Sequence, residues 1–218
     1  EYLNKEGFDT SLVKVSPKAH IITEKHIQYD LKFLKPKLGT TGQGIAPAYA
    51  DKALRIGKLA GNYLDKQYLW DGKLYGEILC EGAQSFWLDL NYGDYPYVTS
   101  SHCTVGSAVL NGVPPQSIRK VYGVAKAYNT YVGAKKFEES NEVFDKIREL
   151  GNEYGSTTGR ARQIGWTNID NLIKACNING VTHLVINKVD ILEEIGSFIT
   201  KYDSLPLKEV LFIELEKR

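Results

Sequence analysis

The sequence lacks methionine, has only three cysteines and contains no long uninterrupted apolar run, although 43% of its 218 residues are hydrophobic. A membrane helix needs about 20 mainly apolar residues, so we expect no membrane span. Charge of one sign is not in excess either, because 27 Lys and Arg residues accompany 26 Asp and Glu residues. Proteins that bind duplexes normally gather a basic excess on one face. We therefore expect no nucleic-acid partner, while small phosphorylated ligands remain open.

The cysteines Cys80, Cys103 and Cys176 are odd in number and widely spaced, without a Cys-x-x-Cys pair. This spacing is typical neither of a disulfide framework nor of a zinc site, and no signal peptide is evident. We expect a cytoplasmic protein whose thiols are free and partly buried. The sequence opens at Glu1 without an initiator, and apolar positions near its end predict a helix without a C-cap: Leu207, Val210, Leu211 and Leu215. From this we expect a piece of a longer protein.

Short apolar runs alternate with amphipathic stretches, which predicts the fold class α/β with a mostly parallel sheet flanked by helices. The runs typical of buried strands are residues 11–15, 76–80, 121–127 and 182–186. One helix is predicted to start at Ser140, its N-cap, and to end near Leu150. A second is predicted from the apolar stripe between Ile169 and Cys176. No repeat or long linker divides the chain, so we expect a single domain over residues 1–218.

Three polar, glycine-rich segments interrupt this pattern, at residues 39–44, 93–106 and 155–165. They are the candidate ligand loops, because ligands of open α/β sheets bind beyond the carboxyl ends of strands. Thr41 lies in the first loop, which is not a Walker A loop and has an ordinary turn as its alternative. In the third segment, Arg160 and Arg162 are one residue apart, which suits a clamp for a carboxylate or phosphate. They follow the hydroxyls of Thr157 and Thr158, and plain surface charge is the alternative.

Two further polar positions follow expected strands. Gln84 lies on the turn after residues 76–80, where an amide can donate to and accept from a purine, a solvent-facing glutamine being the alternative. Asp190 ends the motif Asn187-Lys188-Val189-Asp190, where a carboxylate can accept from guanine N1–H and its amine. Capping of a helix from Ile191 is the alternative. The histidines show no metal-ligand spacing, and we assign no metal ligand: His20, His26, His102 and His183.

Four motifs occur in order along the chain: Thr-Thr-Gly-x-Gly from Thr40, Glu-Gly-Ala-Gln from Glu81, Tyr-Pro-Tyr-Val-Thr-Ser from Tyr95 and Thr-Thr-Gly-Arg from Thr157. In this combination, and over nearly its whole length, the sequence resembles the adenylosuccinate synthetase family. The resemblance implies an α/β fold related to GTP-binding proteins and a homodimer. It also implies the GTP-dependent ligation of L-aspartate to IMP, through a 6-phosphoryl-IMP intermediate and with Mg²⁺.

The same resemblance implies roles for individual residues. Those implied to bind IMP are Thr41, Gln84, Thr99, Arg160 and, across the dimer interface, Arg55. Those implied to bind aspartate are Thr157, Thr158, Arg160 and Arg162, and those implied to bind the guanine of GTP are Lys188 and Asp190. Gln84 would contact the 6-oxygen of IMP as phosphate is transferred to it.

The departures from the family pattern are also informative. The family's Gly-Asp-Glu-Gly-Lys-Gly-Lys loop with its catalytic Asp, the segment with its catalytic His and its C-terminal Ser-Thr-Gly-Pro-Asp segment have no counterpart in these 218 residues. The segment between Gly57 and Glu81 is short, as in compact archaeal or viral members, and Gln43 replaces a common Arg. We expect the 218 residues alone to be inactive. Two alternatives stay open: a phage-type enzyme that joins aspartate to dGMP, and a non-catalytic nucleotide-binding remnant.

Overall fold

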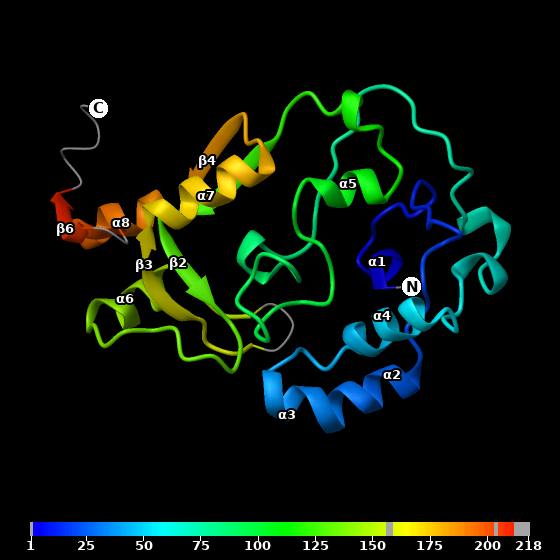
Figure 1. The fold of residues 1–218 in the computed structure, drawn as a ribbon, viewed down its shortest axis with the longest axis horizontal. Helices are drawn as coiled ribbons and strands as arrows, with labels where there is room; N and C mark the ends of the chain where they lie inside the picture. Colours follow the sequence, from blue (N-terminus) through cyan, green and yellow to red (C-terminus); the bar gives the residue numbers. More distant parts are fainter. Residues whose placement is uncertain (1, 156–158, 203–204, 212–218) are drawn as a thin grey trace. The chain divides into compact units, whose positions relative to one another are not determined.

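The structure is a computed structural model that describes residues 2–155, 159–202 and 205–211 (Figure 1). The chain forms two compact units. The first comprises Glu1–Lys35 and Gly42–Glu81, and the second comprises Pro36–Thr41 and Gly82–Arg218. A single adenylosuccinate synthetase-like domain over residues 1–218 stays a prediction. Among the described residues, no helix is long and apolar enough to cross a bilayer.

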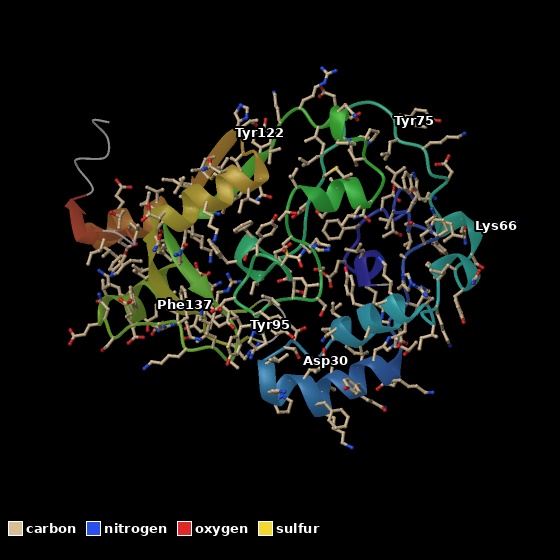
Figure 2. All side chains as sticks on the ribbon, viewed as in Figure 1. Asp30, Lys66, Tyr75, Tyr95, Tyr122 and Phe137 are labelled. Carbon is tan, nitrogen blue, oxygen red and sulfur yellow. The ribbon has the colours of Figure 1, made fainter. Side chains whose placement is uncertain are left out.

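The first unit consists mainly of short helical elements. They are α1 (Tyr2–Lys5), α2 (Glu24–Tyr29), the π-helical turn η1 (Asp30–Leu34), the first residue of α3 (Lys35–Leu38), α4 (Ile45–Leu54), and the 3₁₀ turns η2 (Ala60–Asn62) and η3 (Lys66–Tyr68). His26 of α2 is buried, accepts from the Thr23 N–H at its Nδ1 (3.0 Å) and lies 2.9 Å from an Asp51 oxygen at its Nε2. Asp30, labelled in Figure 2, is also buried and accepts from the Gly44 N–H at 2.9 Å. These contacts join α2 and η1 to α4.

The second unit contains the strands. Its elements after α3 are η4 (Phe86–Leu88), α5 (Gly106–Leu110), η5 (Pro115–Ser117), β1 (Tyr122–Lys126), β2 (Tyr128–Tyr131), α6 (Val143–Leu150), β3 (Gln163–Asn168), α7 (Ile169–Asn179), β4 (His183–Asn187), α8 (Val189–Ile195), β5 (Ser197–Tyr202) and β6 (Leu205–Leu211). β1 and β4 form a parallel pair. The other sheet has the order β2-β3-β5-β6, with β3 and β5 parallel and the outer pairs antiparallel. Helices alternating with strands confirm the α/β class (Figure 1).

Helices α6 and α7 form where the apolar pattern predicts them. α6 buries Phe144 and Ile147 on one face but starts at Val143, three residues after the expected cap Ser140. The Asn141 side chain accepts from the Val143 N–H (3.1 Å) at this end. α7 starts after Asn168, whose side chain accepts from the Asn171 N–H at 2.9 Å, as N-caps do.

The main core lies between the four-stranded sheet and the helices α6 and α8. Its buried members are Tyr128, Phe144, Ile147, Ile164, Trp166, Ile191 and Leu192. The rings of Phe144 and Trp166 are 5.2 Å apart, so α6 is packed directly on β3. Phe137, labelled in Figure 2, packs beside Gly165, where an added Cβ would come within 3.0 Å of its ring. The loops that carry the candidate site residues adjoin the helices and strands that form this core.

Two predicted strands and the predicted last helix are wrong. Residues 11–15 form a turn with a single bridge from Val15 to Leu69, and residues 76–80 form no strand. Strands need a paired neighbour to satisfy their backbone groups, and an apolar run without one stays irregular. Near the end, residues 205–211 form β6, antiparallel to β5, because β5 offers the pairing partner that a strand needs. Leu215 lies outside the described residues. The thiol of Cys80 is exposed rather than partly buried, whereas Cys103 and Cys176 are half-buried.

Candidate functional site

Gly39, the segment 132–134 and Arg160 meet within the second unit. Gly39 has a φ of +70°, and an added Cβ there would lie 2.7 Å from the backbone N of Ala134, so only glycine allows this approach. Arg160 Nη2 donates to the Gly39 carbonyl at 2.9 Å. Three segments far apart in sequence are therefore in contact.

The segment that carries Thr99 is organised by Asp89. This carboxylate is fully buried and accepts from the backbone N–H groups of Asn91 (2.8 Å) and Cys103 (2.6 Å). Burial raises the pKa of Asp89, but the backbone donors outweigh it and the net pKa is lowered, so the group stays ionised. The Thr99 N–H donates to the Leu88 carbonyl at 2.8 Å, which leaves the half-buried Thr99 hydroxyl side chain beside this anchored turn.

Arg160 and Arg162 are held by a short antiparallel pairing. The Glu153 carbonyl accepts from the Arg162 N–H at 2.9 Å, and the Arg160 carbonyl accepts from the Gly155 N–H at 2.8 Å. The pairing starts just after α6 and leads directly into β3. Arg160 and Arg162 are both half-buried. The predicted aspartate-binding residues Thr157 and Thr158 lie outside the described residues.

Glu153 is the centre of a buried, charged cluster. Only 1% of this residue is exposed, and its carboxylate accepts from Tyr128 OH (2.7 Å), Lys126 Nζ (2.6 Å) and Arg162 Nη1 (3.2 Å). Burial raises the pKa of Glu153, but these donors outweigh it and leave the pKa below its usual value. Burial, together with the nearby carboxylate, raises the pKa of Tyr128. Burial lowers the pKa of Lys126, although Glu153 opposes this effect.

The motif around Asp190 has the expected position after a strand. Lys188 is the N-cap of α8, has a φ of +63° and donates from Nζ to the Gly151 carbonyl at 2.8 Å. Asp190 is exposed in the first turn of α8. The alternative that Asp190 caps a helix from Ile191 is wrong, because the helix already starts at Val189 and its N-cap is Lys188. An exposed carboxylate without that capping role is accessible to a ligand.

The remaining predicted residues lie on exposed turns. Gln84 is exposed with a φ of +68°, and no strand precedes it because residues 76–80 are irregular. Thr41 is exposed in the second unit. Arg55 is exposed in the first unit, where it is the C-cap of α4 with a φ of +65°. Among the described residues, no group of three or more His, Cys, Asp and Glu side chains could hold a metal ion.

The model of the family described as "Adenylosuccinate synthetase" matches residues 1–75 and 70–202. The chain belongs to the adenylosuccinate synthetase family. It is 40% identical over 246 residues to the adenylosuccinate synthetase of Thermus thermophilus, which covers 88% of this chain and 59% of that protein. It is 37% identical to that of Deinococcus radiodurans, covering 86% of this chain and 60% of that protein. The chain thus spans about three fifths of the length of these relatives.

Two solved structures are similar. The fully ligated adenylosuccinate synthetase of Plasmodium falciparum has a TM-score of 0.75 and 30% identity, covering 86% of this chain and 57% of that one. The succinoaminodeoxyadenylate synthetase of cyanophage S-2L, bound to dGMP and dATP as an energy donor, has a TM-score of 0.61. Its identity is 20%, over 83% of this chain and 61% of that one, so this likeness shows the fold alone.

Relative to its family, the chain is shortened internally. The alignment with the Thermus thermophilus protein runs over 246 positions, more than the 218 residues of this chain, so the relative has residues inside the matched stretch that lack a counterpart here. The family model matches in two parts that meet at residues 70–75. Tyr75, labelled in Figure 2, is 77% exposed at this junction. This location agrees with the expectation that the segment between Gly57 and Glu81 is short.

Sequence reasoning missed the charged residues that organise this candidate site. Glu153, Lys126 and Asp89 are single charged residues without a recognisable motif around them. One signal was present for Lys126, because a lone lysine ends an otherwise apolar strand. A buried charge requires partners, and these come from segments that the sequence alone does not bring together.

Proposed function

We propose that a complete protein containing this chain is an adenylosuccinate synthetase of purine nucleotide biosynthesis. It joins L-aspartate to IMP and converts GTP to GDP and phosphate. The observation that supports the proposal is the pair Arg160 and Arg162, whose backbone groups are both held in the 153–162 pairing in a chain of this family. Two guanidiniums on one short segment suit a substrate with two carboxylates.

The proposed reaction has two balanced steps. The 6-oxygen of IMP, after loss of the N1 proton, attacks the γ-phosphorus of GTP, and the bond to GDP breaks. The amine of aspartate then attacks carbon 6 and loses a proton to solvent, and the phosphate leaves with the former 6-oxygen. Gln84, exposed on its turn, is proposed to hydrogen-bond this 6-oxygen. Such transfers depend mainly on positioned charge.

The binding roles are assigned on the same basis. Aspartate carboxylates would be bound by Arg160 and Arg162, together with the hydroxyls of Thr157 and Thr158. The 5′-phosphate of IMP would be bound by Thr41 and Thr99, with Arg160 also reaching the nucleotide. Arg55 would complete that site across a homodimer interface. It is exposed at the end of α4 and is therefore accessible to a partner subunit.

For GTP, the support comes from the end of β4. Asp190 presents an exposed carboxylate in the first turn of α8, where it could accept from guanine N1–H and the exocyclic amine. Lys188 is fixed by its bond to the Gly151 carbonyl, so its aliphatic stem is held at the same turn. Adenine offers no matching pair of donors, so a GTP preference is expected.

The family uses Mg²⁺ with GTP, and such an ion would need oxygen ligands from the nucleotide phosphates or from the described residues. They provide no cluster of three or more acidic, His or Cys side chains. No step above depends on a metal held by the described part of the chain. The proposed compartment is the cytoplasm, on the basis of the free cysteines.

A product assay tests the proposal and separates its rivals. The complete protein is incubated with aspartate, GTP and either IMP or dGMP, and the products are identified by chromatography and mass. Adenylosuccinate from IMP, with equal amounts of GDP and phosphate, is the expected result. Preferential 2-aminoadenylosuccinate formation from dGMP would instead establish the phage-type activity. Nucleotide binding without any product would establish the remnant. A polypeptide limited to the 218 residues is expected to give no product.

A further inference from the structure

The charges around Glu153 do not balance locally. Its oxygen Oε2 accepts from both Lys126 and Arg162, while Oε1 accepts from the hydroxyl of Tyr128. One carboxylate therefore serves two cations, and the cluster keeps a net positive charge. The Glu153 side chain is 2% exposed, whereas 29% of the Arg162 side chain is exposed. The Lys126 side chain is 22% exposed, so both cations are more exposed than the carboxylate that they share.

The guanidinium of Arg162 uses only part of its donor set. Five N–H groups are available to an arginine, and Glu153 accepts from one of them at Nη1. Within the described part of the chain, the buried Nε of Arg162 has no hydrogen-bond partner. The backbone of Arg162 is held more completely, since its N–H donates to Glu153 and its carbonyl accepts from Arg148 Nε at 2.9 Å.

We infer that Glu153 is a positioning residue that orients the Arg162 guanidinium toward the carboxylate of the amino-acid substrate. This inference rests on the proposed function, in which Arg162 binds aspartate. The carboxylate of Glu153 is itself fixed from the core side, by Lys126 at the end of β1 and Tyr128 at the start of β2. An arginine that is held at one nitrogen has fewer orientations to lose when its ligand binds.

The first test separates positioning from general stability. In the complete protein, Glu153→Gln keeps the shape of the side chain but removes its charge. We expect the KM for aspartate to rise on the order of 10- to 100-fold, with the KM for IMP nearly unchanged. Glu149→Gln changes an exposed residue in the last turn of α6, four residues before Glu153. It is the matched control and should change neither KM value. In an Arg162→Leu background, Glu153→Gln should add no further rise for aspartate, because it acts through Arg162.

The second test does not require activity. In the complete protein with ¹⁵N-labelled arginine, the Nε–H resonance of Arg162 is assigned from its loss in Arg162→Lys. We expect slow exchange with water and a shift distinct from that of free arginine, both lost in Glu153→Gln. If the complete protein makes no adenylosuccinate, the proposed function fails while this measurement still tests the positioning. An unchanged Arg162 resonance in Glu153→Gln, or equal rises in the KM of aspartate and IMP, would overturn the inference.

Discussion

Glu153 and Arg162 are joined twice, once through the backbone and once through the side chains. The Glu153 carbonyl accepts from the Arg162 N–H at 2.9 Å, and the Glu153 carboxylate accepts from Arg162 Nη1 at 3.2 Å. One bond sets the path of the chain into β3, and the other sets the direction of the guanidinium. A residue with no evident motif thereby supports one with a proposed substrate contact.

The Arg162 assignment predicts a selective defect. In the complete protein, Arg162→Leu should weaken the use of aspartate by about 1.5–3 kcal/mol in kcat/KM, because one charge-assisted hydrogen bond is lost. The KM for IMP should change little. Arg119→Leu, which removes an exposed arginine in the same unit, is the control and should leave both unchanged. Steady-state kinetics with each substrate varied in turn gives the answer, and equal rises in both KM values would contradict the assignment.

The close packing around Gly151, beside the Tyr128 hydroxyl that contacts Glu153, predicts that a larger residue at this position destabilises the fold. An added Cβ would lie 2.4 Å from the Tyr128 hydroxyl and 2.8 Å from the Ile147 carbonyl, so Gly151→Ala should lower the free energy of unfolding by about 1–3 kcal/mol. At Gly82 the nearest atom would be 3.9 Å away, so Gly82→Ala should change stability by less than about 0.5 kcal/mol. Urea unfolding of both variants measures the difference. Equal free energies of unfolding for the two variants would contradict this prediction, because the packing around Tyr128 and Glu153 would then accommodate an added methyl group.

The lowered pKa of Glu153 predicts a loss of stability in acid. Its hydrogen-bond donors, chiefly Lys126 and Tyr128, stabilise the ionised carboxylate in the folded protein. The pKa of Glu153 is therefore lower there than in the unfolded state, in which it is near 4.5. The unfolding free energy gained from this ionised group is therefore complete above pH 4.5 and is lost as the pH falls through the lower pKa of the folded state. Glu153→Gln should be less stable at neutral pH and should show a shallower decline below about pH 4.5. Parallel pH profiles for the two proteins would argue against an ionised Glu153.

The first turn of α8 predicts the choice of nucleotide. If Asp190 accepts from guanine, Asp190→Asn in the complete protein should weaken GTP binding by roughly 1–3 kcal/mol and improve XTP binding, because the new amide donates to the 2-oxo group. Glu193→Gln, an exposed acidic residue of the same helix, is the control. Competition binding with GTP, XTP and ATP measures the preference. Retained GTP selectivity in Asp190→Asn would remove Asp190 from the guanine site.

The fold was predictable where local pattern and tertiary pairing agree. The strands at 121–127 and 182–186 form as β1 and β4 because each finds the other as a parallel partner. The residues around Phe144 and Ile147 form helix α6, because these two apolar side chains pack in the core beside β3. Residues 11–15 are also a short apolar run, but among the described residues they form a single bridge, from Val15 to Leu69, and no strand, because an apolar run does not encode a distant pairing partner.

The candidate site divides in the same way. Arg160 and Arg162 were recognisable because two cations one residue apart form a local pattern. Glu153 was not, since Tyr128 and Lys126 precede it by 25 and 27 residues and reach it only through the packing of β1, β2 and α6. Charge compensation in a buried cluster is a property of tertiary structure.

The fate of the 6-oxygen of IMP tests the proposed function most directly. IMP labelled with ¹⁸O at carbon 6 is converted by the complete protein with aspartate and GTP, and the phosphate released is analysed by mass spectrometry. The two-step reaction predicts one ¹⁸O atom in each phosphate formed together with adenylosuccinate, because the oxygen attacks the γ-phosphorus before the amine displaces it. Unlabelled phosphate, with the label lost to water or retained in the nucleotide, would contradict the proposed ligation.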